Sequence, residues 1–185
     1  MAVNPAEDIV GVWLQDNQGY FIRQNVNVPK LERKSNGKSI YGGKGKEIDI
    51  LGTNNKGKKI WVEVTVSPNP YLPRSDERIR KALVLIQDKF CKEKEDEVKR
   101  IFNNKKFNKL FVYSHRIFRG EQEKEFLVKV KKMMPDMEVR NFEDIFNETI
   151  ENLNHYSVDP TRIYLYYAKF FLQKKNVLRR GNSIT

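Results

Sequence analysis

Two acidic residues on neighbouring segments, Asp49 and Glu63, have the spacing needed for metal chemistry. Asp49 lies in residues 46–52 and Glu63 in residues 60–66, and both segments alternate apolar with polar residues, as half-buried strands do. Residues 53–59 between them are rich in turn formers, which predicts an antiparallel hairpin. A turn centred on the middle of that segment would set the two acids directly opposite each other, with Cβ atoms about 5 Å apart. Carboxylates that close repel unless a cation lies between them, so the pair predicts a divalent-metal site.

The same alternation assigns the side chains of each strand to the two faces of the predicted sheet. In the first strand, Ile48 and Ile50 are expected on one face, with Glu47, Asp49 and Leu51 on the other. In the second strand, one face is expected to carry Ile60, Val62, Val64 and Val66, and the other Trp61, Glu63 and Thr65.

The elements around this hairpin predict an α/β fold. Asn4 and Pro5 are typical of a helix start, and the helix would end near Gly19. Glu7 lies in its first turn, where position alone favours a surface carboxylate that complements the helix dipole. Further strands are expected over residues 20–28, 110–113 and 137–140, and further helices over residues 75–90, 92–99, 121–134, 141–153 and from 160 onward.

Composition limits the class of protein and its partners. The chain has 185 residues with 39% hydrophobic side chains, which is enough for a folded core, and its net charge is +11. Such an excess favours a polyanionic partner, most often a nucleic acid, although a generally basic or solubilising surface is the alternative. There is one cysteine, and neither a long apolar run nor a signal-peptide core is evident. We therefore expect a soluble, cytoplasmic protein.

Glu7 on the first helix, Asp49 in Glu-Ile-Asp-Ile-Leu-Gly and Glu63 in Trp-Val-Glu-Val-Thr, followed by a basic helix, resemble the core of the PD-(D/E)XK nuclease superfamily. The spacing is most similar to that of archaeal Holliday-junction resolvases and their restriction-enzyme-like relatives. The resemblance covers residues 4–114 and implies a restriction-endonuclease-like central mixed β-sheet flanked by helices, with additional C-terminal helices. We expect a nuclease-like core over residues 1–140 and a helical extension over residues 141–185 packed on the same domain.

By this resemblance, Asp49, Glu63 and the main-chain carbonyl of Val64 would hold Mg²⁺ or Mn²⁺, and Glu7 would reach the same site from its helix. The implied activity is the hydrolysis of phosphodiester bonds in DNA. The metal would neutralise charge on the phosphate and lower the pKa of water.

One residue departs from the family pattern. The family's lysine, two residues after the second acid, is Thr65 here, and a hydroxyl is not a cationic hydrogen-bond donor. Lys46 at the strand entrance and Lys81 on the following basic helix are candidates for that role. Alternatively, the metal acts without a lysine, or the protein has lost activity.

The expected partner is duplex or branched DNA, and a homodimer would supply two active sites for cutting two strands. The residues expected to follow the phosphate backbone are Lys44, Lys46, Lys58, Lys59, Arg74, Arg78 and Lys81.

Two other functions compete with the endonuclease. One is a catalytically inactive nucleic-acid-binding protein on a degenerate nuclease fold. The other is a structural hairpin whose acids pair with Lys46 and Lys59 across the strands. The nuclease hypothesis requires that Asp49 and Glu63 converge, and it would be weakened if they were locked into ion pairs with no cavity in front.

Overall fold

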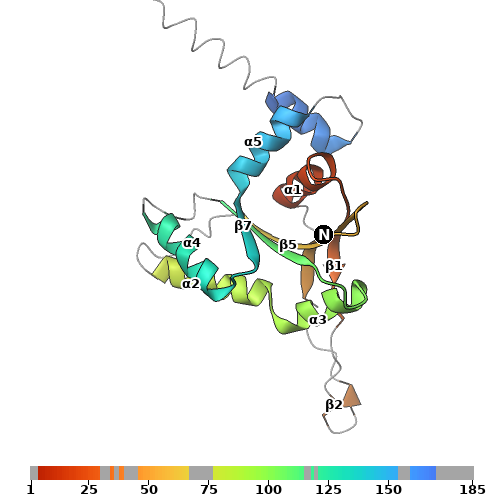
Figure 1. Ribbon diagram of the computed structural model, residues 1–185, viewed down its shortest axis with the longest axis vertical. Helices are drawn as coiled ribbons and strands as arrows, with labels where there is room; N and C mark the ends of the chain where they lie inside the picture. The colour runs from red at the N-terminus through yellow and green to blue at the C-terminus, as the bar shows by residue number, and fades with distance from the viewer. Residues whose placement is uncertain are drawn as a thin grey trace, which may run out of the picture.

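A five-stranded mixed β-sheet with helices on both faces forms the centre of the molecule (Figure 1). The computed structural model describes residues 4–29, 34–35, 38–39, 46–66, 77–114, 118, 121–153 and 159–169. Its elements are α1 (Pro5–Asp16), β1 (Tyr20–Asn27), β2 (Lys34–Ser35), β3 (Lys38–Ser39), β4 (Glu47–Asn54), β5 (Lys59–Thr65), α2 (Glu77–Lys89), α3 (Lys92–Ile101), β6 (Asn108–Tyr113), α4 (Gln122–Met133), β7 (Met137–Asn141) and α5 (Phe142–Asn152). Residues 160–169 are also helical.

The strand order is β1-β4-β5-β6-β7, and the sheet changes character at β5. The β1–β4 and β4–β5 pairs are antiparallel, whereas the β5–β6 and β6–β7 pairs are parallel. Parallel neighbours require crossover connections, and here helices α2 and α3 link β5 to β6 while α4 links β6 to β7. These three helices therefore cover one face of the sheet, and α1 and α5 cover the other (Figure 1).

The β4–β5 hairpin has the register predicted from its turn. The pairs run from Thr53 opposite Lys59 to Ile50 opposite Val62, and all are centred on residue 56. The Asn54 side chain fixes the turn, because its Oδ1 accepts hydrogen bonds from the main-chain amides of residues 56 and 58 at 3.0 and 2.9 Å. Gly57 supplies the left-handed backbone that the turn needs, with φ of 73°. This register brings Asp49 level with Glu63.

The two faces of the sheet bury separate apolar clusters. Beneath α1 and α5, Ile60, Val62 and Val64 of β5 share one buried face, as the alternation predicts. Ile50 of β4 packs with them. Beneath α2, α3 and α4, the opposite face packs Leu51, Trp61, Phe111 and Tyr113 against helix residues such as Ile86, Val98 and Phe126. Asp49 and Glu63, described below, lie near the start of β4 and the end of β5 respectively.

Ile48 and Ile50 do not share a buried face, so that prediction is wrong. Ile48 packs with Val26 in the cluster beneath α2–α4, whereas Ile50 packs beneath α1. The reversal coincides with Asn25 on the paired strand β1, which has the left-handed φ of 53°. Asparagine tolerates this conformation better than other side-chain-bearing residues because it can hydrogen-bond locally.

The C-terminal part of the described chain packs on α1. Trp13 Nε1 donates a hydrogen bond of 2.8 Å to Glu148 on α5, and Leu165 of the last helical segment packs with Val12 and Ile150. Residues 170–185 of the predicted extension lie outside the described residues. Within the described chain, every helix is too short or too polar to cross a membrane.

Candidate active site

Asp49 lies where the β4–β5 pairing stops. The last main-chain pair is Ile50 with Val62, and one residue further the Asp49 carboxylate itself accepts the Val64 main-chain amide at 2.7 Å. The side chain is only 8% exposed. A buried carboxylate therefore occupies the place of a main-chain acceptor, and its Oδ2 atom faces β5.

Glu63 is fully buried and surrounded by donors. Trp61 Nε1 donates to its Oε1 at 2.8 Å, and Lys94 Nζ lies 2.8 and 2.9 Å from its two oxygens. Lys94 comes from α3 and is itself only 5% exposed. Burying a charge is costly unless it is paired and hydrogen-bonded, and this carboxylate meets both conditions.

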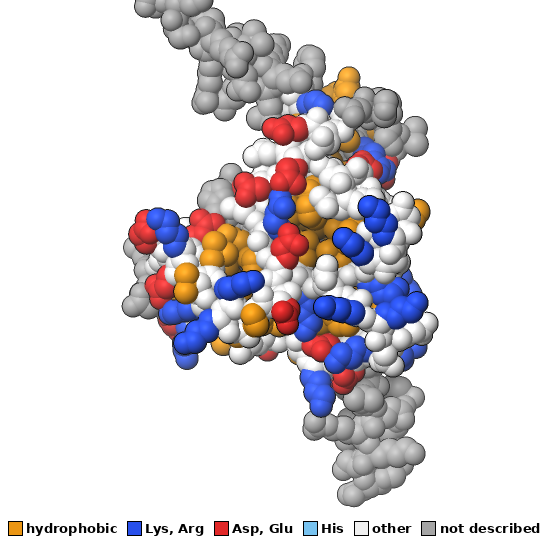
Figure 2. Space-filling view, in the orientation of Figure 1, with side chains coloured by type: hydrophobic (Ala, Val, Ile, Leu, Met, Phe, Trp, Pro, Cys, Tyr) orange, Lys and Arg blue, Asp and Glu red, His pale blue; other side chains and the backbone are white. Residues whose placement is uncertain are grey.

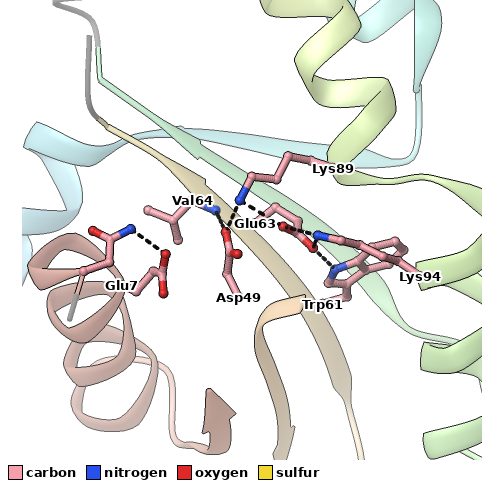
Figure 3. Close-up of polar contacts among 8 residues, drawn as sticks. Glu7, Asp49, Trp61, Glu63, Val64, Lys89 and Lys94 are labelled. Atoms are coloured by element: carbon pink, nitrogen blue, oxygen red, sulfur yellow. Dashed lines mark hydrogen bonds and ion pairs between the residues drawn. The ribbon is translucent and has the colours of Figure 1, made fainter. Parts of the chain in front are cut away.

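Lys89, the last residue of α2, joins the two acids (Figure 3). Its Nζ lies 2.6 Å from Asp49 Oδ2 and 3.3 Å from Glu63 Oε2, and its side chain is 23% exposed. Burial acts to lower the pKa of Lys89, but the charges of Asp49 and Glu63 outweigh it and raise the pKa above its ordinary value. The ammonium thus lies where two converging carboxylates need a cation.

Burial also changes the titration of the acids. Desolvation, followed by repulsion from Asp49, raises the pKa of Glu63 to about 7, although Lys89 and Lys94 oppose the rise. Desolvation and then Asp49 also raise the pKa of Glu7. Protonation of Glu63 near neutral pH would weaken its hold on any cation, so cation binding at this site should strengthen as the pH rises.

Glu7 borders the pair from α1 (Figure 3). Its carboxylate accepts a hydrogen bond from the Asn4 side chain, and it is close enough to Asp49 for that charge to raise its pKa. With its amide nitrogen turned toward the acids, Asn25 donates to Glu47 at 2.8 Å and to Glu7 at 3.3 Å. Glu7 is therefore more than a dipole-complementing surface residue, because burial and the charge of Asp49 raise its pKa.

The lysines predicted to replace the family's lysine lie elsewhere. Lys46 pairs with Glu93 at 3.1 Å and contacts Cys91 Sγ at 3.2 Å, and Lys81 pairs with Glu77 at 3.4 Å within α2. The ammonium that lies within ion-pair distance of both Asp49 and Glu63 is that of Lys89. Thr65 ends β5 beside Tyr113 of β6 and is half-buried.

Of the seven residues predicted to contact DNA, Lys46 pairs with Glu93 as described above, and the other six divide into three groups. Lys58 and Lys59 lie at the turn end of the hairpin. Lys59 is four residues from Glu63, which is about 13 Å along the strand. Arg78 and Lys81 lie in the first turns of α2. Lys44 and Arg74 are outside the described residues.

The structural-hairpin hypothesis named the wrong partners for the acids. Lys46 pairs with Glu93, and the Lys59 Nζ lies over the Phe102 ring, 4.9 Å from its centroid. The acids are held instead by Lys89 and Lys94, which come from helices distant in sequence. The hairpin alone therefore does not satisfy its own carboxylates.

Sequence reasoning missed Lys89, Lys94 and the Trp61 side chain as members of the site. Lys94 lies within a mixed charge run that predicts an exposed helix, yet it shares a buried stripe with Glu97 and Val98 at helical spacing. That spacing was the one available signal. For Lys89 there was only its place in the last turn of α2, where a cation suits the helix dipole.

The donor chemistry suits a hard divalent cation, with two carboxylate groups and few other ligands, as Mg²⁺ prefers. Within the described part of the chain, however, no group of three His, Cys, Asp or Glu side chains is arranged as a metal site. Glu7 accordingly does not complete a three-acid set with Asp49 and Glu63. The residues present therefore fit a metal site with two carboxylate ligands, Asp49 and Glu63. In this structure the ammonium of Lys89 balances their charge.

Comparison with protein-family models, with curated proteins and with solved structures finds no match to this chain.

Proposed function

We propose that this protein is a Mg²⁺-dependent DNA endonuclease on a restriction-endonuclease-like fold. One observation carries the proposal: Asp49 and Glu63, from neighbouring strands, converge on the ammonium of Lys89. The PD-(D/E)XK motif also brings acids and a lysine together, although its lysine lies two residues after the second acid, where this chain has Thr65. Lys89 offers from α2 the cationic donor that Thr65 does not supply.

Each residue has a role that follows from its surroundings. Asp49 and Glu63 would hold the divalent ion, together with the Val64 carbonyl that the resemblance implies. Mg²⁺ bound there would neutralise charge on the phosphate and make water a better nucleophile at neutral pH. Trp61 and Lys94 fix the Glu63 carboxylate from behind, because both donate to it from buried positions. Glu7 would add negative charge at the edge of the site.

Lys89 differs from Lys94 in its freedom to change partners. Its side chain is 23% exposed, whereas the Lys94 side chain is 6% exposed. With a metal held by Asp49 and Glu63, the Lys89 ammonium would be free to leave these acids and donate to a phosphate oxygen. An ammonium on a flexible stem suits this exchange better than a planar guanidinium would.

The test measures cleavage of supercoiled and branched DNA in Mg²⁺ or Mn²⁺ by the wild type, Asp49→Asn and Lys89→Met. We expect metal-dependent nicking by the wild type and a loss of at least about a hundredfold in both variants, the scale of removing one group that stabilises transition-state charge. Lys129→Met is the matched control, because Lys129 is a helical lysine paired with Glu125 on α4.

Metal binding is measured separately through stability. With Mg²⁺ at ten times its dissociation constant, linkage predicts that the free energy of unfolding of the wild type rises by about 1.4 kcal/mol. Asp49→Asn should show no such rise. An absence of metal stabilisation in the wild type, or cleavage equal in Asp49→Asn and Lys129→Met, would contradict the proposal.

A second candidate is a catalytically inactive nucleic-acid-binding protein on the same fold. It is favoured by Thr65 and by the ion pairs of Glu63, whose two oxygens both already face lysine ammonium groups. This candidate predicts salt-sensitive DNA binding with no cleavage in any metal, and binding that is unchanged in Asp49→Asn.

A further inference from the structure

A concentration of positive charge lies beside the start of β6, toward the other end of β5 from Glu63. A cavity of about 650 Å³ opens there between the C-terminal end of α3 and the start of β6. Its lining includes four lysines and two acids: Lys99, Lys105, Lys106, Lys109, Glu95 and Asp136. Figure 2 shows Lys and Arg side chains gathered near this end of α3. We call this set the α3–β6 basic surface.

The charges of this surface are only partly compensated. Glu95 binds both Lys99 and Lys109, at 2.7 and 2.6 Å, so one carboxylate serves two ammonium groups. Within the described residues, no ion pair holds Lys105 or Lys106, and both are exposed. The surface therefore keeps an excess of positive charge that can be offered to a ligand.

The backbone between α3 and β6 presents Lys105 and Lys106 outward. Asn103 and Asn104 both have left-handed backbone, with φ of 52° and 56°, and the Asn104 amide donates to the Lys99 carbonyl at 2.7 Å. This tight turn reverses the chain immediately before the two lysines. They therefore project from a fixed turn closed by main-chain hydrogen bonds.

An aromatic wall supports the lysines. Phe107 lines the cavity and is half-buried, and its ring contacts Trp61 and Phe102 with centroids 6.2 and 5.9 Å away. Lys109 Nζ lies over the Trp61 ring at 5.5 Å from its centroid. Lysines beside a partly exposed aromatic ring form the kind of surface that nucleic acid backbones and bases use.

The acidic side chains around Asp49 and Glu63 favour a separate anchor for a polyanion. Four acids gather there, Glu7, Glu47, Asp49 and Glu63, against the two buried or half-buried lysines of the site. Without a bound metal this end would repel phosphates. Affinity for DNA must then come from elsewhere on the molecule.

We propose that the α3–β6 basic surface is a second nucleic-acid-binding site that docks the phosphate backbone of the DNA away from the cleavage centre. This inference rests on the proposed action on DNA, and it adds an anchor that is separate from the catalytic residues. Asn108 of β6 pairs with Ile60, three residues and about 10 Å along the strand from Glu63. The anchor therefore contacts a different part of the substrate from the bond that is cut.

The experiment measures binding of a 30-base-pair duplex and of its single strand by fluorescence anisotropy in EDTA, so that no cleavage occurs. The double variant Lys105→Gln/Lys106→Gln is compared with Lys124→Gln/Lys129→Gln, which removes two positive charges that are paired with glutamates on α4 or at its start. We expect the first variant to lower duplex affinity roughly tenfold or more at 0.1 M salt and to reduce the salt slope by about 1.8. The control should leave both unchanged.

The outcomes separate this inference from the endonuclease proposal. Equal affinity and salt slope in the two double variants would overturn the basic surface, even if the wild type cleaves DNA. A selective loss in the first variant supports the surface, even if no metal gives cleavage. If the first variant loses affinity for the duplex but not for the single strand, the anchor binds duplex backbone. If it loses affinity for the single strand but not for the duplex, the anchor binds single strands. Displacement of DNA by polyglutamate as effective as by unlabelled DNA would indicate an acidic protein partner and overturn the inference.

Discussion

The pH dependence of stability tests the environment of Glu63 directly. Burial raises the pKa of this carboxyl to about 7 in the folded protein, from an ordinary value of 4.5. The folded state therefore holds a proton on Glu63 that the unfolded chain has already released between these two values. Because the folded state then binds more protons, the contribution of Glu63 to stability falls as the pH rises from about 4.5 to about 7.

The size of the effect follows from that difference in pKa. At about 1.4 kcal/mol per pH unit, the contribution of Glu63 to the free energy of unfolding should fall by about 3 kcal/mol between pH 4.5 and 7.5. Urea unfolding of the wild type and of Glu63→Gln at several pH values isolates this contribution, because glutamine does not ionise. The wild type should therefore lose about 3 kcal/mol relative to the variant over that range.

Glu95→Gln provides a control of opposite sign. Hydrogen bonds from Lys109 and Lys99 lower the pKa of Glu95, so its stabilising contribution is present above pH 4.5 and is lost as the pH falls further. The difference in free energy of unfolding between the wild type and Glu95→Gln should then stay constant from pH 5 to about 7.5. If the difference in free energy of unfolding between the wild type and Glu63→Gln were also constant over this range, the raised pKa of Glu63 would be refuted. Glu63 would then be fully ionised and held by its two lysines.

Two further perturbations probe the residues that position the site. Lys94→Met should lower the free energy of unfolding by about 3–5 kcal/mol in urea titrations, because it leaves the buried Glu63 short of a cation, whereas the exposed neighbour Lys92→Met should change it by less than about 0.5 kcal/mol. Equal losses would show that Lys94 contributes only helix packing. Asn25→Val should cost about 1–2 kcal/mol through its left-handed backbone, and Asn25→Gly should cost less. If glycine were as damaging as valine in the same titrations, the hydrogen bonds to Glu7 and Glu47 would be the larger contribution.

Sequence alone predicts the part of the site that lies within the hairpin. Strand alternation and a turn centred on residue 56 set the register of β4 and β5, and the structure has that register. Local rules succeed here because both strands and the turn are contiguous in the chain. The wrong assignment of Ile48 coincides with a feature outside this segment, the left-handed backbone of Asn25 in β1.

The cationic half of the site was not predictable from local pattern. Lys89 and Lys94 reach Asp49 and Glu63 across 40 and 31 positions of sequence respectively. Their arrival depends on how α2 and α3 pack on the sheet, which periodicity does not specify. Lys46 and Lys81 were more attractive candidates because they are near the hairpin or at the start of a basic helix, but ion pairs with Glu93 and Glu77 engage them.

The buried charges argue against a purely structural role for this cluster. Desolvating two carboxylates and two ammonium groups costs several kcal/mol per ion, and a well-packed apolar set of similar volume is often as stable or more stable. The same end of the sheet already has an apolar core in contact with it, including the Trp61 ring tilted against the Phe90 ring with centroids 4.7 Å apart. Extending that core would be the simpler way to stabilise the strand ends. A site that instead keeps Lys94 buried and Lys89 partly exposed agrees with the proposed exchange of the Lys89 ammonium for a divalent metal.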